Sequence, residues 1–173
     1  MFSLLKRLIF RLKVNRLKFS SIGKSLIIID FPIYIHNSNT HIGNDVVIYP
    51  NVMFWGEGKI IIGNDVKIGN NVMIHASSGS TVHIKDQTII AANTYIIDSN
   101  HNISKDISIQ DQGVESSPVS IGPDCWIGAS CVIGKGANIM KGAVIGANSF
   151  VNSEIPEYAI AVGSPAKIIK FRI

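Results

Sequence analysis

A six-residue period governs the second half of the chain. Aliphatic side chains recur at this spacing at Ile121, Ile127, Ile133, Ile139, Ile145 and Val151. Four residues after each of the first five stands a small side chain: Cys125, Cys131, Ala137, Ala143, Ser149. A period of six matches neither an α-helix nor a simple alternating strand. It predicts a parallel β-helix, in which each hexad supplies one short strand and one corner, and three hexads make one triangular coil.

The same period extends into the first half of the chain, with slips of phase. Clear hexads begin at Ile42, Ile48, Ile62, Ile68, Ile74, Ile84, Ile90 and Ile96. One hexad cannot bury its isoleucine alone, so stacked coils are expected to share one continuous core. The glycines that follow many inward residues are expected at corners, where the chain turns tightly or φ is positive.

Charge divides the chain into two parts. Residues 1 to 29 hold seven lysines and arginines and no acid, which leaves nine basic against twelve acidic residues in the remainder. The net charge of +4 therefore belongs to the N-terminus, and a general nucleic-acid surface is not expected. We divide the chain into a basic amphipathic segment, residues 1–20, and one β-helix domain, residues 21–173.

The N-terminal segment is expected to form a helix over about residues 1–19. Its apolar side chains share one arc of a helical wheel: Phe2, Leu4, Leu5, Leu8, Ile9 and Leu12. The helix either docks on the β-helix or a neighbouring subunit, or contacts an anionic membrane surface. Charges interrupt its apolar run too often for a signal peptide, and no run approaches the ~20 residues of a membrane span.

Both cysteines occupy the small inward position of successive hexads, which lie on different faces of a triangular coil. A disulfide between Cys125 and Cys131 is therefore not expected. Buried, reduced thiols fit a cytoplasmic protein, with peripheral contact at the inner face of the membrane as a further alternative.

The longest interruption of the hexads, residues 99–118, is polar and carries His101 near its start. Long insertions in compact repeats are usually functional or mobile. His41 and His83 precede inward isoleucines, so both are expected to point outward as ordinary surface histidines, and His36 is treated in the same way. His75 follows an inward isoleucine at a corner, beside Ser77, where a substrate contact is conceivable.

The stretch Ile121–Gly128 and the tail Ala161-Val-Gly-Ser-Pro-Ala-Lys-Ile-Ile-Lys170 resemble the left-handed β-helix acyltransferases. That family includes galactoside, maltose and serine acetyltransferases, and the resemblance covers roughly residues 42–170. It implies an all-β, left-handed parallel β-helix with a short C-terminal tail helix. It also implies acetyl-CoA as co-substrate and a homotrimer whose active sites lie between two prisms.

The resemblance further implies roles for individual residues. Asp98-Ser99-Asn100-His101 with a downstream Gln112-Gly113 resembles the polysaccharide-modifying branch, which makes His101 the general base and Asp98 its orienting partner. The backbone N–H of Ala129 would stabilise the oxyanion. Acetyl-CoA contacts are expected at Ala129, Ala147, Asn152, Ser153, Lys167 and Lys170. Acceptor contacts are expected at His75, Ser77, Asn100 and Gln112.

The sequence thus predicts an enzyme that moves an acetyl group from acetyl-CoA to a sugar hydroxyl, in surface polysaccharide or a precursor. The main alternative is N-acetylation of a nucleotide-linked amino sugar. The γ-class carbonic anhydrases share the fold, and His36 and His41 have the spacing of two of their ligands. However, His75 follows that pair where the family pattern places a ligand before it, so no metal is expected. A non-catalytic scaffold is the remaining alternative.

Overall fold

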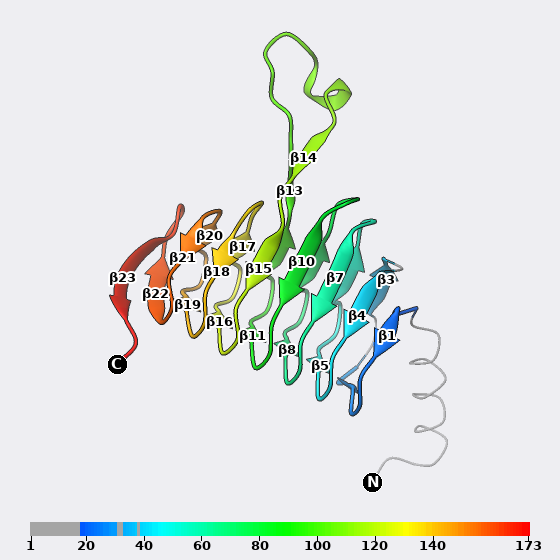
Figure 1. The fold of residues 1–173 in the computed structure, drawn as a ribbon, viewed down its shortest axis with the longest axis vertical. Helices are drawn as coiled ribbons and strands as arrows, with labels where there is room; N and C mark the ends of the chain where they lie inside the picture. The colour runs from blue at the N-terminus through cyan, green and yellow to red at the C-terminus, as the bar shows by residue number, and fades with distance from the viewer. Residues whose placement is uncertain (1–17, 31–32, 38) are drawn as a thin grey trace.

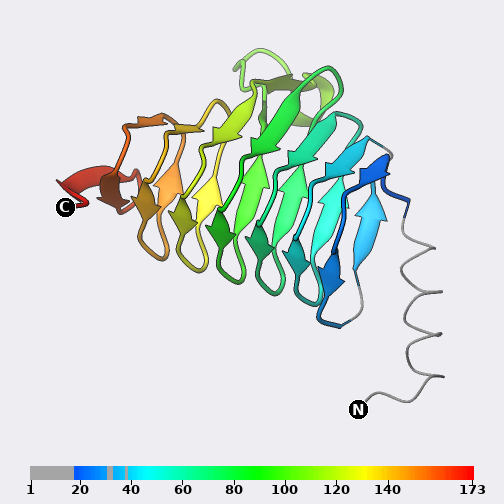
Figure 2. The same cartoon turned by 60° about the horizontal axis from the view of Figure 1, so that its bottom comes forward.

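The computed structural model describes residues 18–30, 33–37 and 39–173. The predicted N-terminal helix falls on residues 1–17, outside the described residues. Figure 1 shows an elongated prism of stacked coils, with one hairpin standing out from its side. Figure 2 shows the flat faces of the prism, on which strands of successive coils lie side by side.

Three parallel sheets form the faces of the prism, and each coil contributes one strand to each face. Face 1 contains β1 (Ser21–Ile22), β4 (Thr40–Ile42), β7 (Lys59–Ile62), β10 (Thr81–Ile84), β15 (Val119–Ile121), β18 (Asn138–Ile139) and β21 (Glu154–Ile155). Face 2 contains β2 (Ile27–Ile28), β5 (Val47–Ile48), β8 (Lys67–Ile68), β11 (Ile89–Ile90), β16 (Trp126–Ile127), β19 (Val144–Ile145), β22 (Ala159–Val162) and β23 (Lys167–Phe171). Face 3 contains β3 (Tyr34–His36), β6 (Met53–Trp55), β9 (Met73–His75), β12 (Tyr95–Ile97), β17 (Val132–Ile133) and β20 (Phe150–Val151).

The inward aliphatic residues stack in register along each face. On face 1, Ile62 pairs with Ile84, which pairs with Ile121, which pairs with Ile139. These side chains have at most 2% of their surface exposed, and together with their counterparts on the other faces they form one core. The hexad prediction is therefore confirmed, because burial of the six-residue register and parallel pairing of coils follow from the same pattern.

The corners turn in a different way from the one predicted. Positive φ angles fall on the residue just before the small inward position, for example Asp45 (φ 57°), Asn71 (φ 59°) and Asp124 (φ 57°). Short polar side chains tolerate this conformation because they bond locally. The glycine after the inward isoleucine has another reason. A Cβ on Gly122 would lie 2.7 Å from the backbone N of Lys141, so glycine is required by the close approach of the next coil.

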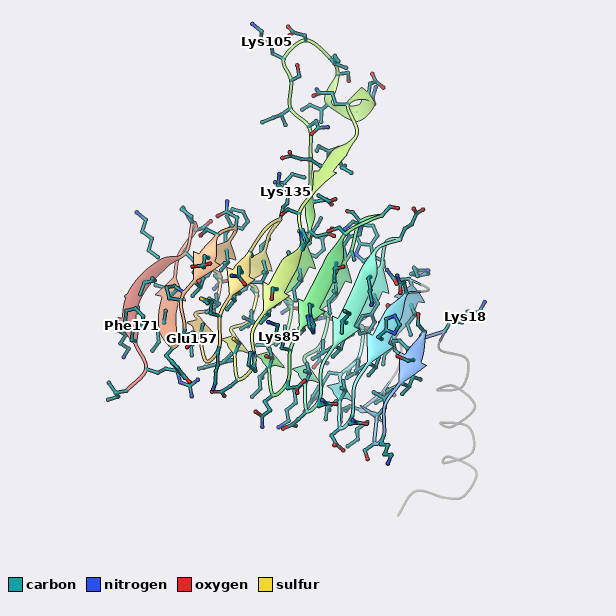
Figure 3. All side chains as sticks on the ribbon, in the orientation of Figure 1. Lys18, Lys85, Lys105, Lys135, Glu157 and Phe171 are labelled. Atoms are coloured by element: carbon teal, nitrogen blue, oxygen red, sulfur yellow. The ribbon has the colours of Figure 1, made fainter. Side chains whose placement is uncertain are left out.

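The segment between β12 and β15 is an ordered hairpin. Strands β13 (Ser99–His101) and β14 (Val114–Ser116) pair antiparallel, and a 3₁₀ turn, η1 (Ile109–Asp111), lies near the tip. Gln112 braces the tip, since its side chain accepts a hydrogen bond from the Ser104 amide and donates to the carbonyls of Ser104 and Ile107. In Figure 3 Lys105 marks the tip and Lys135, which forms an ion pair with Glu115, lies near the base.

The C-terminal tail is a strand, so the predicted tail helix is wrong. β23 turns back and pairs antiparallel with β22 at the end of face 2. Arg172 fastens it, donating hydrogen bonds to the carbonyl of Gly142 (2.9 Å) and the carboxylate of Asp124 (3.0 Å). The last coil of a solenoid leaves backbone groups unpaired, and a returning strand satisfies them where a helix would not.

The two cysteines are free and buried, as predicted. The thiols of Cys125 and Cys131 donate to carbonyls of the following coil, Met140 and Gly146 respectively. Within the described residues, no helix is long and apolar enough to cross a bilayer.

Candidate active site

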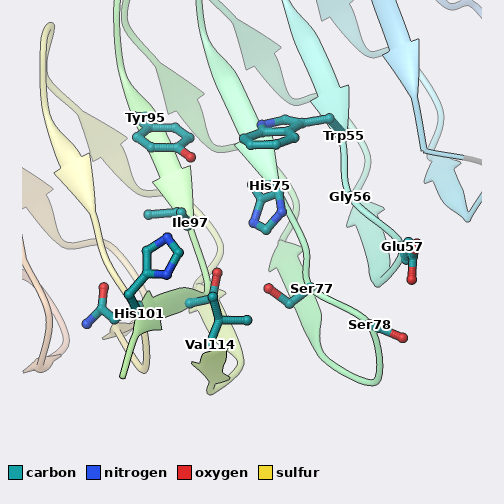
Figure 4. Close-up of a pocket in the computed structure, with 12 residues that line it drawn as sticks. Trp55, Gly56, Glu57, His75, Ser77, Ser78, Tyr95, Ile97, His101 and Val114 are labelled. Carbon is teal, nitrogen blue, oxygen red and sulfur yellow. The ribbon is translucent and has the colours of Figure 1, made fainter. Parts of the chain in front are cut away.

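A pocket of about 560 Å³ lies at the edge between faces 3 and 1, where the hairpin leaves the prism. Its lining comes from strands β6, β9 and β12 and from the base of the hairpin (Figure 4). The lining residues are Trp55, Gly56, Glu57, His75, Ser77, Ser78, Tyr95, Ile97, Ser99, Asn100, His101 and Val114. The volume is that of a small-molecule site, and apolar walls with a few polar groups are the usual composition of such sites.

The stacking of coils aligns three of these side chains in one column. The last residues of β6, β9 and β12 are register partners: Trp55 with His75, and His75 with Ile97. The rings of Trp55 and His75 are stacked, with centroids 4.2 Å apart and planes inclined by 53°. Parallel strands are spaced closely enough that such a contact follows from the register alone.

His75 stands against a buried carboxylate. Its Nδ1 lies 3.6 Å from Oδ1 of Asp98, and Asp98 is fully buried whereas the His75 side chain is 15% exposed. Burial lowers the pKa of His75 below its usual value, and the nearby charge of Asp98 opposes this effect without cancelling it. A histidine in this environment is neutral near pH 7.

Asp98 is bound elsewhere than the sequence predicted. Both of its carboxylate oxygens accept a hydrogen bond from the backbone N–H of Ser77, at 2.9 and 3.0 Å. Within the described residues no hydrogen bond or ion pair joins Asp98 to His101. The predicted orienting role toward His101 therefore needs correction: the buried carboxylate anchors the Ser77 corner and faces His75, because β12 ends with Asp98 turned toward the preceding coil.

His101 is exposed and lies at the mouth of the pocket. It belongs to β13 and is the register partner of Val114, and Figure 4 shows its ring beside Ile97 and Val114. Asn100 lines the same mouth. Gln112 does not line the pocket, because its amide is engaged inside the hairpin tip, so the structure does not bring it to the other predicted acceptor contacts.

The predicted acetyl-CoA contacts lie on other parts of the prism. Ala129 and Ala147 follow β16 and β19 and stack at the edge between faces 2 and 3, where the Asn148 amide donates to the Ala129 carbonyl. Lys167 and Lys170 are exposed on β23. Asn152 and Ser153 share the edge of the pocket but lie beyond β20, further along the axis. One chain therefore does not bring Ala129 and His101 together.

Sequence reasoning did not identify the apolar wall of the pocket, which contains Trp55, Tyr95, Ile97 and Val114. A usable signal was present. Trp55, His75 and Ile97 each directly follow an inward residue of face 3, so counting faces as well as hexads would have placed them in one column. Glu57, two residues after Trp55, was likewise missed.

The histidines considered as metal ligands lie on different sheets, His36 on face 3 and His41 on face 1. Trp55 lies between His36 and His75 in the face 3 column. No group of three histidine, cysteine or carboxylate side chains arranged for a metal occurs in the part of the chain that the structure describes. His41 and His83 flank inward residues on face 1 and are directed outward, as predicted.

Comparison with known proteins agrees with the fold and the repeat. Residues 118–153 match the model of the bacterial transferase hexapeptide (six repeats), and residues 59–97 match the hexapeptide repeat of succinyl-transferase. Fold and repeat together define a left-handed β-helix protein of the hexapeptide transferase class.

Curated relatives narrow this class. The chain is 34% identical over 152 residues to a putative lipopolysaccharide biosynthesis O-acetyl transferase of Escherichia coli, covering 83% of this chain and 78% of that protein. It therefore belongs to the hexapeptide-repeat acetyltransferase family. A probable acetyltransferase of Mycobacterium tuberculosis is 39% identical over 92 residues, but the match spans only 53% of this chain and 31% of the relative. The galactoside O-acetyltransferase of E. coli is 31% identical over 90 residues, 44% of its length.

Solved structures share the fold at lower identity. AntD, an N-acyltransferase from Bacillus cereus solved with dTDP and 3-hydroxybutyryl-CoA, superposes with a TM-score of 0.79 at 23% identity, covering 94% of this chain and 88% of AntD. A maltose O-acetyltransferase from Clostridium difficile gives a TM-score of 0.64 at 23% identity, covering 99% of this chain and 78% of that one.

Proposed function

We propose that this protein transfers an acetyl group from acetyl-CoA to a hydroxyl of a sugar in surface polysaccharide or a precursor. The observation that carries the proposal is the pocket itself: His101 stands exposed at its mouth, and its walls are aromatic and aliphatic. Family membership supports acetyl transfer, and the relatives named for lipopolysaccharide biosynthesis and for galactosides support a sugar acceptor.

His101 acts as the general base in this proposal. A hydroxyl is a weak nucleophile at neutral pH, and an imidazole can remove its proton as the oxygen attacks the thioester carbonyl. A new C–O bond forms, the C–S bond breaks, and the CoA thiolate leaves and takes up the proton held by His101. The tetrahedral oxyanion formed between these events needs a fixed N–H donor, for which we propose the amide of Ala129.

The acetyl-CoA groove requires a neighbouring copy, and we propose a homotrimer. His101 and Ala129 lie on different edges of one prism, separated by face 3, so a composite site needs the Ala129 edge of another chain. Face 3 also carries an outward apolar column suited to contact between copies: Tyr34, Met53, Met73, Tyr95, Val132 and Phe150. Lys167 and Lys170 of β23 would then meet the CoA phosphates as point charges. A monomer by light scattering that remains active at the same concentration would contradict the trimer.

N-acetylation of a nucleotide-linked amino sugar is the second candidate. The carboxylate of Glu57 lines the pocket, and a carboxylate there would attract a protonated amine. AntD, which shares the fold, has been solved with a dTDP-linked 4-amino sugar and coenzyme A. Replacing Glu57 with Gln should weaken an amino-sugar acceptor and leave a neutral sugar nearly unaffected.

Turnover of acetyl-CoA against a panel of neutral sugars, amino sugars and sugar nucleotides tests the proposal. Removing the base in His101→Ala should lower kcat by about 10²–10⁴-fold. The dissociation constant for CoA should stay nearly unchanged, because the imidazole serves the thioester end. His83→Ala is the matched control on face 1 and should be silent. If His101→Ala retains near-normal kcat with the true acceptor, the base is a different residue.

A further inference from the structure

Trp55 gives the pocket a large aromatic wall. Its side chain is 36% exposed, and it is held in place by its stack on His75 and by register pairing within face 3. Tryptophan combines a broad apolar surface with little conformational freedom, which makes it an effective ligand-binding wall. The C–H face of a pyranose ring is a flat apolar surface of comparable size.

His75 presents one buried nitrogen and one free nitrogen. Nδ1 is buried without a hydrogen-bond partner and lies 3.6 Å from Oδ1 of Asp98. That separation is beyond hydrogen-bond range, but a small rotation of the ring would close it, and buried polar atoms are normally paired. With its proton on Nδ1 toward the carboxylate, the ring offers Nε2 as a hydrogen-bond acceptor. No described residue hydrogen-bonds to Nε2.

Asp98 is fixed from two sides. Its carboxylate accepts from the Ser77 amide, and its backbone carbonyl accepts from the Ser117 amide at 2.8 Å, which closes the base of the hairpin. The carboxylate is therefore held between the corner that follows β9 and the strand that carries His101. A buried charge so constrained is suited to fixing the orientation of the imidazole beside it.

We propose that Trp55 and His75 form the acceptor subsite, and that the acceptor is a pyranose with two neighbouring hydroxyls. This inference rests on the proposed function. The C–H face of the sugar lies on Trp55, the hydroxyl to be acetylated faces His101, and the adjacent hydroxyl donates a hydrogen bond to Nε2 of His75. Asp98 is a positioning residue that acts through His75.

The electrostatics of the pocket agree with this arrangement. Burial lowers the pKa of His75, so the ring stays neutral near pH 7 and keeps a lone pair for the sugar hydroxyl. Glu57 and Asp98 are the carboxylates facing this wall, and Tyr95, whose pKa is raised by burial, remains a neutral phenol. Both imidazoles therefore meet a neutral sugar rather than an anion.

Saturation-transfer NMR with methyl glucopyranoside, methyl galactopyranoside and methyl mannopyranoside tests the subsite on the full chain. At least one should receive saturation from the wild type, chiefly at its ring C–H protons. The signal should be lost in Trp55→Leu and His75→Phe, and kept in His101→Ala and in the control His83→Phe. His75→Phe preserves an aromatic ring against Trp55, and circular dichroism verifies folding. If Trp55→Leu does not fold, Trp55→Phe replaces it.

Kinetics with the glycoside that binds distinguish recognition from structure. His75→Phe should raise the acceptor KM about tenfold, the effect of one lost hydrogen bond, with kcat little changed. His75→Gln keeps an acceptor oxygen and should recover part of the loss, whereas a merely structural role would not separate Gln from Phe in this way.

Two outcomes overturn the subsite: no pyranoside binds the wild type, or binding and KM are unaltered in the Trp55 and His75 variants. Failure of the proposed function is a separate result. Glycoside binding that depends on Trp55, without acetyl-CoA consumption for any acceptor, would refute acetyl transfer and leave the sugar site standing. Normal turnover with unaltered variants would refute the subsite alone.

Discussion

Substituting Gly122 with alanine should damage the fold through contact between coils. An added Cβ would lie 2.7 Å from the Lys141 amide nitrogen and 2.8 Å from the Met140 carbonyl carbon, and both are backbone atoms of the next coil. Backbone cannot move aside as a side chain can, so the coils must separate locally. Inserting a methyl group into such a close contact costs about 1–3 kcal/mol, and a backbone clash belongs at the upper end of this range.

Two other glycines serve as matched comparisons. Gly79 has a φ of +74° but no atom within 4 Å of the added Cβ, so Gly79→Ala should cost only the backbone strain of about 1–2 kcal/mol. A Cβ on Gly134 would lie 2.9 Å from the ring of Phe150, a side chain that can rotate, so Gly134→Ala should be milder than Gly122→Ala.

Urea denaturation followed by circular dichroism measures the three effects at one protein concentration, since oligomer stability depends on concentration. The midpoint should fall most for Gly122→Ala. If Gly79→Ala loses as much stability as Gly122→Ala, close approach of the coils is not what selects glycine after the inward isoleucine.

Three further predictions follow from the described residues. Burial raises the pKa of Cys125 to about 11, so a thiol reagent at pH 8 should react with it only after unfolding; labelling of the native protein at the free-thiol rate would contradict this. Burial lowers the pKa of His75 below 6.5, so the unfolded chain binds more protons and the free energy of unfolding should decrease as the pH falls below that value; His75→Phe should flatten this dependence in denaturant titrations. Deleting residues 2–18 should reduce binding to anionic vesicles and preserve soluble turnover, whereas unchanged vesicle binding or a misfolded product would favour a docked helix.

The core of the prism could be predicted from sequence because its period is imposed by burial. Ile84, Ile121 and Ile139 carry the same chemistry at the same register, so six-residue spacing alone locates them. The end of the solenoid could not be predicted in this way. The tail of β23 has no hexad, and its pairing with β22 is decided by unsatisfied backbone groups that no side-chain pattern records.

The candidate site was only partly predictable for a related reason. His101 is conspicuous because it lies in the long insertion outside the hexads. The wall made by Trp55 and His75 depends on which face each strand occupies, and slips of phase hide that assignment until the coils are counted. The partner of Asp98 was mistaken because the nearest histidine in sequence is His101, whereas the nearest carboxylate neighbour in space is the histidine one coil away.

The hairpin has a consequence for how such a chain can diversify. Thirty-seven residues separate the register partners Ile84 and Ile121, whereas eighteen separate Ile121 and Ile139, yet both pairs stack in line. The chain leaves and re-enters the prism at one point, closed by the bond from Ser117 to Asp98, so the length of the excursion does not alter the frame. The segment behaves as a cassette: a hairpin of different length and composition can be exchanged there, changing what the pocket accepts while every inward isoleucine keeps its place.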